Sequence, residues 1–333
     1  MVTKQDEEWL LSYRPVRGIP ADAYTVVQIS EPDSRVEKIV LKPNPMEPQN
    51  FEDFIGQNSQ KEVLQIVVDS ANVENRLIPC VMLTGPYGHG KTTLAKLAVR
   101  RHKKKVVIID GAIAGNTIES SDDTIYIVDE AHNIPAQVAD SYNILIDSNQ
   151  LRIIACTTNP GALPAPFRSR FRNIYLTSYN EGDIAEIVTR AARRLKCRII
   201  PSAAQIIGER SKLNPRVALN LLEFTREMSL LNGINRLGVK DIENSLSKLD
   251  IDTLGLNSID RKYLSLISSN PVGLNYISSA LSIDTATIQQ DIEPYLIQLG
   301  LIERTSKGRV AGTAAKLKAS REIIEKRLRI NDL

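Results

Sequence analysis

The segment Gly-Pro-Tyr-Gly-His-Gly-Lys-Thr-Thr at positions 85–93 constrains the fold more than any other part of the chain. It follows an apolar run at 81–84 and opens a helix-forming stretch, which is the order of strand, glycine-rich turn and helix. The glycines Gly85, Gly88 and Gly90 let backbone N–H groups surround a phosphate, and the helix dipole adds positive potential there. A chance glycine-rich turn would not be expected between a strand and a helix. The sequence therefore predicts a nucleoside triphosphate site.

Side chains on two segments supply the chemistry that such a site needs. Lys91 is expected to reach the β- and γ-phosphates, and the Thr92 hydroxyl to help hold Mg²⁺. An apolar strand at 124–128 ends in two acids, of which Asp129 would bind Mg²⁺ and Glu130 would polarise the attacking water. An acidic turn after a buried strand is common, so the pair alone is a weak signal. It becomes informative because it follows a phosphate loop.

Polar residues further along the chain extend the predicted site. Thr158 or Asn159, at the end of the next apolar strand, could orient the water, although their segment is also ordinary turn chemistry. An arginine of the cluster at 167–172 could reach the γ-phosphate of a neighbouring subunit. Arginine clusters are more often solvated surface. Arg216, at a helix start, could report the nucleotide state from a separate helical domain.

The order of apolar runs predicts an α/β domain followed by helical ones. Alternating strands and helices up to about residue 178 indicate a parallel sheet. Its strands are expected at 81–84, 105–109, 124–128, 151–157 and 173–177. Helical periodicity without strands continues to about residue 250, and three short helices and a hairpin turning at Lys307-Gly308 follow. A basic helix is expected at 315–330.

The two ends and the composition narrow the class of protein. Alternating runs at 23–29 and 35–41 predict a small hairpin of unassigned function. The three cysteines match neither a metal motif nor a disulfide framework, and no apolar run is long enough to span a membrane. The N-terminus is too charged for a secretory signal. Because the net charge is only +3, any contact with DNA must come from local clusters of basic residues. We expect a soluble cytoplasmic protein.

Seven motifs in this order resemble the RuvB family of AAA+ ATPases, hexameric motors that drive Holliday-junction branch migration. The motifs lie at 51–57, 85–93, 129–132, 155–159, 168–171, 215–216 and 293–298. The stretch 252–311 is the most specific part, because AAA+ proteins in general do not share it. The resemblance implies a chain of successive domains. They are an N-terminal extension at 1–47, an α/β nucleotide-binding domain at 48–179, a helical lid at 180–250, a winged-helix DNA-binding domain at 251–314 and a basic helical tail at 315–333.

The resemblance also implies roles for single residues in ATP and Mg²⁺ binding. The phosphate and metal contacts would be Gly88, Lys91, Thr92 and Thr93, with Asp129 as the metal-binding acid and Glu130 as the catalytic acid. The residues that respond to the γ-phosphate would be Thr158 as first sensor, Arg170 as the finger acting on a neighbouring subunit, and Arg216 as second sensor. The adenine pocket would be lined by Ile55, Gly56 and Tyr179.

The wing would carry the DNA contacts. Arg304 and Arg309 match the family's DNA-contacting arginines, and Lys307 between them adds charge, so the wing could neutralise phosphates without a basic whole protein. The alternative is an ordinary solvated hairpin. Duplex or four-way junction DNA is the implied substrate, and ATP would bind between the subunits of a homo-oligomeric ring, a hexamer by resemblance.

The chain departs from the family pattern at three places. Glu47 stands where the family usually has an arginine, and Arg172 where it usually has a glycine. Between Glu130 and Thr157 the family has a β-hairpin that docks onto RuvA. This chain lacks about twenty residues in the same interval, which is too many for loop variation to supply a hairpin. A RuvA-type partner is therefore doubtful for this diverged relative, and residues 1–47 are a candidate for a different docking surface.

Three functions fit these residues. The first is an ATP-dependent motor that moves duplex or junction DNA in recombination and repair. The second is a loader ATPase that uses ATP as a switch to place a partner on DNA, which the lost hairpin and the N-terminal extension favour. The third is a nucleotide-stabilised DNA-binding scaffold. The pair Asp129-Glu130 and the finger Arg170 argue against a scaffold, which needs neither.

Overall fold

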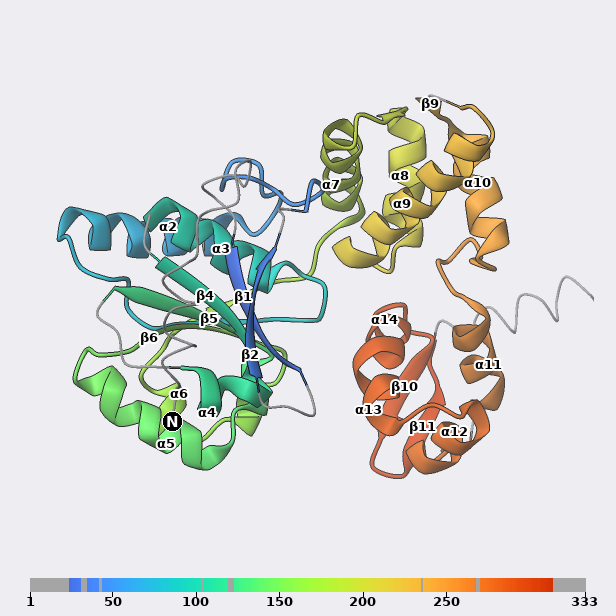
Figure 1. Cartoon of the computed structure of the whole chain (residues 1–333). Helices are drawn as coiled ribbons and strands as arrows, with labels where there is room; N and C mark the ends of the chain where they lie inside the picture. Colours follow the sequence, from blue (N-terminus) through green and yellow to red (C-terminus); the bar gives the residue numbers. More distant parts are fainter. Residues whose placement is uncertain are drawn as a thin grey trace, which may run out of the picture. The chain divides into compact units, whose positions relative to one another are not determined.

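The computed structural model describes residues 24–30, 35–41, 44–102, 105–118, 123–234, 236–267 and 270–313. The chain divides into two compact units, Met1–Pro86 with Gly90–Thr177, and Tyr87–His89 with Ser178–Leu333. Figure 1 labels most of the strands and helices of both units. The expected helix at 315–330 lies outside the described residues. None of the described helices is both long and apolar enough to cross a membrane.

A seven-stranded sheet organises the first unit, in the order β2-β1-β4-β5-β6-β3-β7. The five strands expected from the apolar runs are β3 (Val81–Thr84), β4 (Lys105–Asp110), β5 (Thr124–Asp129), β6 (Arg152–Thr157) and β7 (Arg172–Tyr175). Neighbours among these five pair in parallel, which confirms the predicted parallel α/β sheet. The phosphate-loop strand β3 lies between β6 and β7, so the loops after β3 and β6 leave the same edge of the sheet.

The N-terminal hairpin belongs to this sheet. Strands β1 (Tyr24–Ser30) and β2 (Arg35–Leu41) pair antiparallel, as the alternating runs predicted. Beyond that prediction, β1 also pairs in parallel with β4, placing Thr25 opposite Val107. The segment that the sequence presents as a separate preface therefore adds two strands to the nucleotide-binding sheet.

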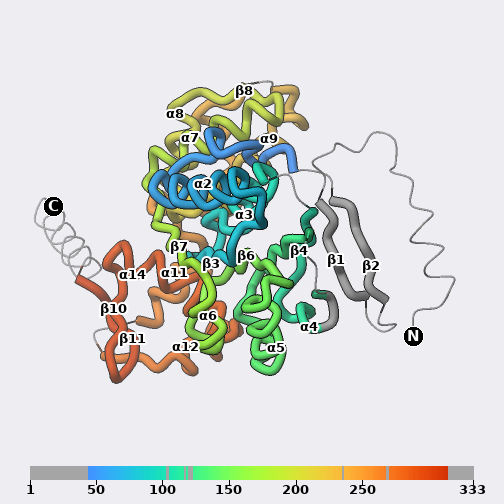
Figure 2. The backbone as a smooth tube through the Cα atoms, turned by 90° about the vertical axis from the view of Figure 1, so that its left-hand side faces the viewer, coloured from blue at the N-terminus to red at the C-terminus, as the bar shows by residue number. Residues whose placement is uncertain are grey.

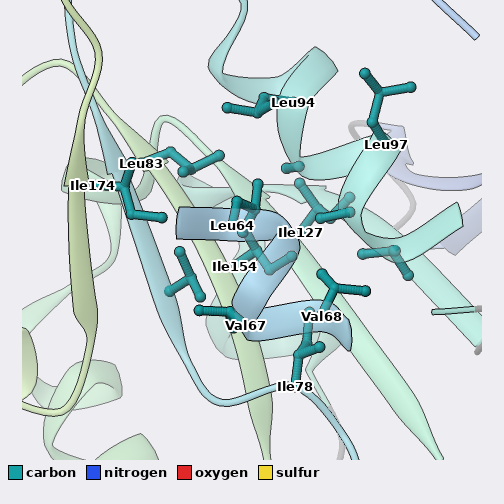
Figure 3. Close-up of a cluster of buried hydrophobic side chains, with 14 of the residues drawn as sticks. Leu64, Val67, Val68, Ile78, Leu83, Leu94, Leu97, Ile127, Ile154 and Ile174 are labelled. Atoms are coloured by element: carbon teal, nitrogen blue, oxygen red, sulfur yellow. The ribbon is translucent and has the colours of Figure 1, made fainter. Parts of the chain in front are cut away.

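Helices cover both faces of the sheet, as Figure 1 shows. On one face, α2 (Asn58–Val73) and α3 (Lys91–His102) pack on alternate strand residues, and Figure 3 shows this cluster of Leu, Ile and Val side chains. On the other face, α5 (Ala136–Asp147) and α6 (Ala165–Arg168) pack on the intervening residues. Within β5, Ile125 and Ile127 belong to the first core, and Tyr126 and Val128 to the second. A strand buried on both faces reads as the continuous apolar run seen in the sequence.

The interval between β5 and β6 holds no strand. A short 3₁₀ turn, η2 (Ala131–Asn133), and helix α5 are the elements described there, and α5 ends at Asp147, shortly before β6 begins at Arg152. Residues 123–234 are described without a gap, so the protruding hairpin expected of the family is absent from this interval.

The second unit begins with four helices, α7 (Glu181–Arg194), α8 (Pro201–Arg210), α9 (Pro215–Leu231) and α10 (Val239–Lys248). One expectation is wrong in detail, because β8 (Arg198–Ile199) and β9 (Arg236–Leu237) form a short parallel pair. Two-residue strands are too short to show a period of two, so the sequence pattern could not reveal them.

A winged-helix domain completes the second unit and confirms the predicted class. Its first helices are α11 (Ser258–Leu266) and α12 (Leu274–Leu281). A third helical segment joins α13 (Thr285–Thr287), a π-turn at Ile288–Ile292 and α14 (Glu293–Gln298), and the strands β10 (Ile302–Thr305) and β11 (Gly308–Ala311) follow. The wing β10–β11 is antiparallel. Gly308 has a φ of 141°, and a Cβ there would lie 2.5 Å from the Val272 carbonyl oxygen, so glycine is needed at this turn.

Candidate active site

The phosphate loop has the backbone that its glycines predict. Strand β3 ends at Thr84 and helix α3 begins at Lys91, so the loop leads directly into a helix N-terminus. Gly88 and Gly90 adopt φ values of 76° and 86°, a left-handed conformation that glycine takes without steric cost. The segment thus offers backbone N–H groups and the positive end of a helix dipole at one place.

Lys91 is held at the base of the loop. Its side chain is buried, and its ammonium donates to the carbonyl oxygens of Gly85 and Pro86, each at 3.0 Å. Burial lowers the pKa of Lys91, and the nearby carboxylates of Glu130 and Asp129 act in the opposite direction. The ammonium is satisfied by carbonyl groups that phosphate oxygens could replace at little cost, because both are oxygen acceptors.

The predicted metal ligands lie in contact. The Thr92 hydroxyl donates to Asp129 Oδ2 at 2.9 Å, which joins the start of α3 to the end of β5. A hydroxyl and a carboxylate side by side suit Mg²⁺, which prefers oxygen ligands and takes few of them from the protein when phosphates are present. The donor set therefore fits the metal that the sequence predicts.

Glu130 occupies an unusual backbone position directly after Asp129. Its φ is 44°, and its N–H donates to Asp129 Oδ1 at 3.1 Å. A left-handed conformation in a residue other than glycine costs on the order of 1 kcal/mol and is concentrated at functional sites. Gly111 makes room for this turn, because a Cβ at that position would lie 2.5 Å from the Glu130 carbonyl oxygen.

Two residues without a role in the sequence interpretation join the acidic pair to β6. His132 Nδ1 lies 3.4 Å from Glu130 Oε2 and 3.2 Å from Thr157 Oγ1. Thr157 is fully buried, and its carbonyl accepts a hydrogen bond from the Gly85 N–H at 3.3 Å. The Asp-Glu-x-His spacing could have drawn attention to His132. Thr158, the predicted sensor, follows at the same strand end and is half-buried, and its role stays a prediction.

Arg216 lies against the phosphate loop residue Tyr87 within the second unit. Asn214 caps α9 by accepting from the Arg216 N–H at 2.9 Å, and its amide donates to the Tyr87 carbonyl at 3.0 Å. The Arg216 guanidinium donates to the Tyr87 hydroxyl and lies 4.8 Å from the centre of that ring, a cation–π distance. The predicted second sensor therefore contacts the loop through Tyr87.

The predicted adenine residues are divided between the two units. Tyr179 is buried in the second unit, and its hydroxyl donates to the His89 carbonyl at 3.3 Å. Ile55 and Gly56 are half-buried in the first unit, directly before Gln57, whose side chain bonds the backbone of Thr177. Their role at the base stays a prediction.

Arg170 makes its contacts away from the phosphate loop. Its guanidinium bonds Asp147 and the Pro166 carbonyl within the described part of the chain. The role of Arg170 as a finger stays a prediction.

The wing arginines converge on one buried carboxylate. Glu293 is fully buried and accepts from Arg304 Nε at 2.6 Å, Arg309 Nε at 2.8 Å and the Tyr263 hydroxyl at 2.9 Å. The Arg309 side chain is only 13% exposed, whereas that of Arg304 is 43% exposed. Lys307, at the turn of the wing, is exposed. Arg309 thus has a structural role that the sequence did not indicate, and DNA contact by these three residues stays a prediction.

The Glu293 cluster predicts an acid-sensitive wing. Burial raises the pKa of Glu293, but hydrogen bonds from Arg309 and Tyr263 and the charge of Arg304 hold it below its ordinary value. Its stabilising contribution is therefore fully present above the ordinary carboxyl pKa of about 4.3 and is lost as the pH falls through the lower folded value. At pH 7, Glu293→Gln should lower the stability of this domain by about 3 kcal/mol, because it leaves the Arg309 charge buried without its partner.

Thermal unfolding of the wild-type protein and of Glu293→Gln between pH 7 and pH 3 measures this loss of stability. The difference between wild type and variant should shrink as the pH falls, whereas Glu303→Gln, at an exposed carboxylate on the same hairpin, should change little. A difference that stays constant over this range would contradict the assignment.

A parallel sheet with a phosphate loop after β3 and an acidic pair after β5, followed by a helical lid and a winged helix, defines an AAA+ ATPase. Three family models match successive parts of the chain: the Holliday junction DNA helicase RuvB P-loop domain at 46–142, the RuvB AAA lid domain at 179–252 and the RuvB C-terminal winged helix domain at 253–317. The chain belongs to the RuvB family.

Relatives and solved structures agree with this membership. Holliday junction branch migration complex subunit RuvB of Pseudothermotoga lettingae is 31% identical over 300 residues, which cover 80% of this chain and 87% of the relative. The protein of the same name from Campylobacter jejuni subsp. doylei is 31% identical over 84% of this chain and 94% of its own length. The solved RuvB Holliday junction branch migration motor of Thermotoga maritima matches with a TM-score of 0.76 at 29% identity, over 83% of this chain and 99% of that one.

Proposed function

We propose that this protein is an ATP-dependent motor that drives branch migration of Holliday junctions or moves along duplex DNA. The contact between Thr92 and Asp129 carries the proposal, because it joins the phosphate loop to the acidic strand end as a nucleotide-hydrolysing site requires. Family membership supports the DNA substrate, since the relatives are named as branch migration subunits.

Each residue of the site then has a task in hydrolysis. Lys91 would bind the β- and γ-phosphates, with the loop glycines, Thr92 and Thr93 around them, and Mg²⁺ held by Thr92 and Asp129 would neutralise developing charge on the phosphate oxygens. Glu130 would accept a hydrogen bond from the attacking water. The left-handed turn at Glu130 would hold its backbone in place for this task. Thr158 and Arg216 would register the γ-phosphate, and Ile55, Gly56 and Tyr179 would bind the base.

The proposed role of the finger calls for a ring of subunits. Arg170 would act on the ATP of a neighbouring subunit, so full activity would require a homo-oligomeric ring, for which the family suggests a hexamer. The residue ranges 48–179, 180–250 and 251–314 would be the nucleotide-binding, lid and DNA-binding parts. Duplex phosphates would be contacted by Lys307 and Arg304, the exposed cations of the wing, with Arg309 beside them.

A loader ATPase is the second candidate. It is favoured by the hairpin β1–β2 on the edge of the sheet and by the lack of a strand between β5 and β6. The first feature gives the chain a surface for a different partner, and the second removes the family's docking hairpin.

Two measurements on the purified protein separate these functions. Stimulation of ATP hydrolysis by duplex or junction DNA is expected of the motor and would exclude a scaffold. ATP-driven separation of a labelled strand from the duplex to which it is annealed is expected of the motor but not of a loader. Hydrolysis that never moves DNA would favour the loader.

A further inference from the structure

The segment that carries Arg170 is anchored on both sides. Phe167 and Phe171 are buried, and their rings lie edge to face with 4.8 Å between centroids. Backbone hydrogen bonds from Arg170 to Phe167 and from Phe171 to Arg168 close the turn between α6 and β7. The backbone at Arg170 is therefore fixed, while its side chain stays 27% exposed.

Asp147 fixes the side chain as well. Arg170 Nε donates to Asp147 Oδ1 at 2.8 Å and Nη2 to Oδ2 at 2.6 Å, which is the bidentate fork of a strong arginine–carboxylate pair. Nη1 donates to the Pro166 carbonyl at 2.6 Å. Hydrogen bonding to Arg170 lowers the pKa of Asp147 and raises that of Arg170, so both stay charged at neutral pH. A guanidinium has five N–H groups, and these three bonds leave two for phosphate oxygens.

The position of Asp147 has no explanation in helix stability. It is the last residue of α5, where a carboxylate interacts unfavourably with the helix dipole. The short connection to β6 holds this helix end in place, because Asn149 turns the chain with a φ of 64° and its side chain bonds Arg152. Figure 2 shows α5 and α6 side by side, which brings the carboxylate to the finger segment.

The neighbouring arginines of the cluster are placed differently. The buried Nε of Arg168 has no hydrogen-bond partner in the described part of the chain, and Arg172 is exposed on β7. The Asp147 carboxylate thus selects Arg170 among the three.

We propose that Asp147 is a positioning residue for the arginine finger, an inference that rests on the proposed function of Arg170. By holding the guanidinium in one rotamer, Asp147 removes the cost of ordering it when the neighbouring subunit's γ-phosphate must be neutralised. The pair acts in trans: Asp147 serves the site of the adjacent subunit and not the site of its own.

Steady-state kinetics of DNA-stimulated ATP hydrolysis give the first test. Asp147→Ala should lower kcat on the order of tenfold and leave KM for ATP unchanged, because positioning of the finger affects the transition state more than ground-state binding. Asp147→Glu should restore part of kcat. Asp140→Ala removes an exposed carboxylate from the same helix and should have no effect. A wild-type kcat for Asp147→Ala would overturn the inference.

Mixed rings test the action in trans. Subunits with Glu130→Gln cannot hydrolyse ATP but supply an intact finger pair, so mixing them with Asp147→Ala subunits should raise turnover per Asp147→Ala subunit several-fold. The mixture of Glu130→Gln with Arg170→Ala is the matched control. A gain in the control without a gain for Asp147→Ala would overturn the role of Asp147 alone. No gain in either mixture would overturn the assignment of Arg170 in the proposed function, and this inference with it.

Discussion

Replacing Glu130 with glutamine should lower the rate of ATP hydrolysis by at least about a hundredfold and leave ATP binding intact. Glutamine keeps the shape of the side chain but cannot accept a proton from the attacking water, and positioned general bases contribute about 10²–10⁴-fold. The contacts proposed to bind phosphate and metal are made by Lys91 and by the Thr92–Asp129 pair, and neither involves the Glu130 side chain. Steady-state ATPase assays and equilibrium titration with ATP measure the two quantities.

The separation of binding from turnover distinguishes this result from unfolding. A variant that lost both would indicate damage to the left-handed turn at Glu130. A variant that hydrolysed ATP at the wild-type rate would contradict the assignment of Glu130 as the catalytic acid. His132, whose Nδ1 lies 3.4 Å from Glu130 Oε2, would then be the next candidate.

Replacing Lys91 with alanine should weaken ATP binding roughly a hundredfold, because hydrogen bonds to charged groups contribute about 1.5–3 kcal/mol. The buried ammonium at the base of the loop has no cationic substitute among the other residues of 85–93, which are Gly, Pro, Tyr, His and Thr. Calorimetric titration with ATP measures this loss directly.

Lys96→Ala is the matched control for Lys91→Ala. Lys96 lies on the same helix, more than one turn after Lys91, and pairs with Glu47 at 3.2 Å, so its loss removes the same charge without removing a contact to the loop carbonyls. Affinity should stay close to wild type in Lys96→Ala. Equal affinities for both variants would show that Lys91 does not bind the phosphates.

The nucleotide site could be predicted because its signals are local. The loop at 85–93 and the pair Asp129-Glu130 each follow an apolar strand, and parallel strands bring their ends together. Strands β3, β5 and β6 were also predictable, since they are buried on both faces and appear as continuous apolar runs. The edge strand β7 has a single buried residue, Ile174, and gave a weaker signal. The two-residue pair β8–β9 lacked such a run.

The contacts that depend on distant parts of the chain could not be predicted. Glu293 meets Arg304 and Arg309 in the fold, and no periodicity marks it as a buried carboxylate. The pairing of β1 with β4 joins segments separated by about eighty residues, and an alternating run does not indicate which strand it will join. The same holds for Asp147 and Arg170, and for His132 and Thr157, which are brought together by different strands and helices.

The measurement that tests the central claim most directly is ATP-driven dissociation of a labelled four-way DNA junction by the purified protein alone. The account predicts that wild-type protein with ATP and Mg²⁺ dissociates the junction and that Glu130→Gln, which still binds ATP, does not. Such a result would establish a junction motor that works without the family's docking hairpin. Robust ATP hydrolysis in the same reaction without junction movement would contradict the motor and favour a loader.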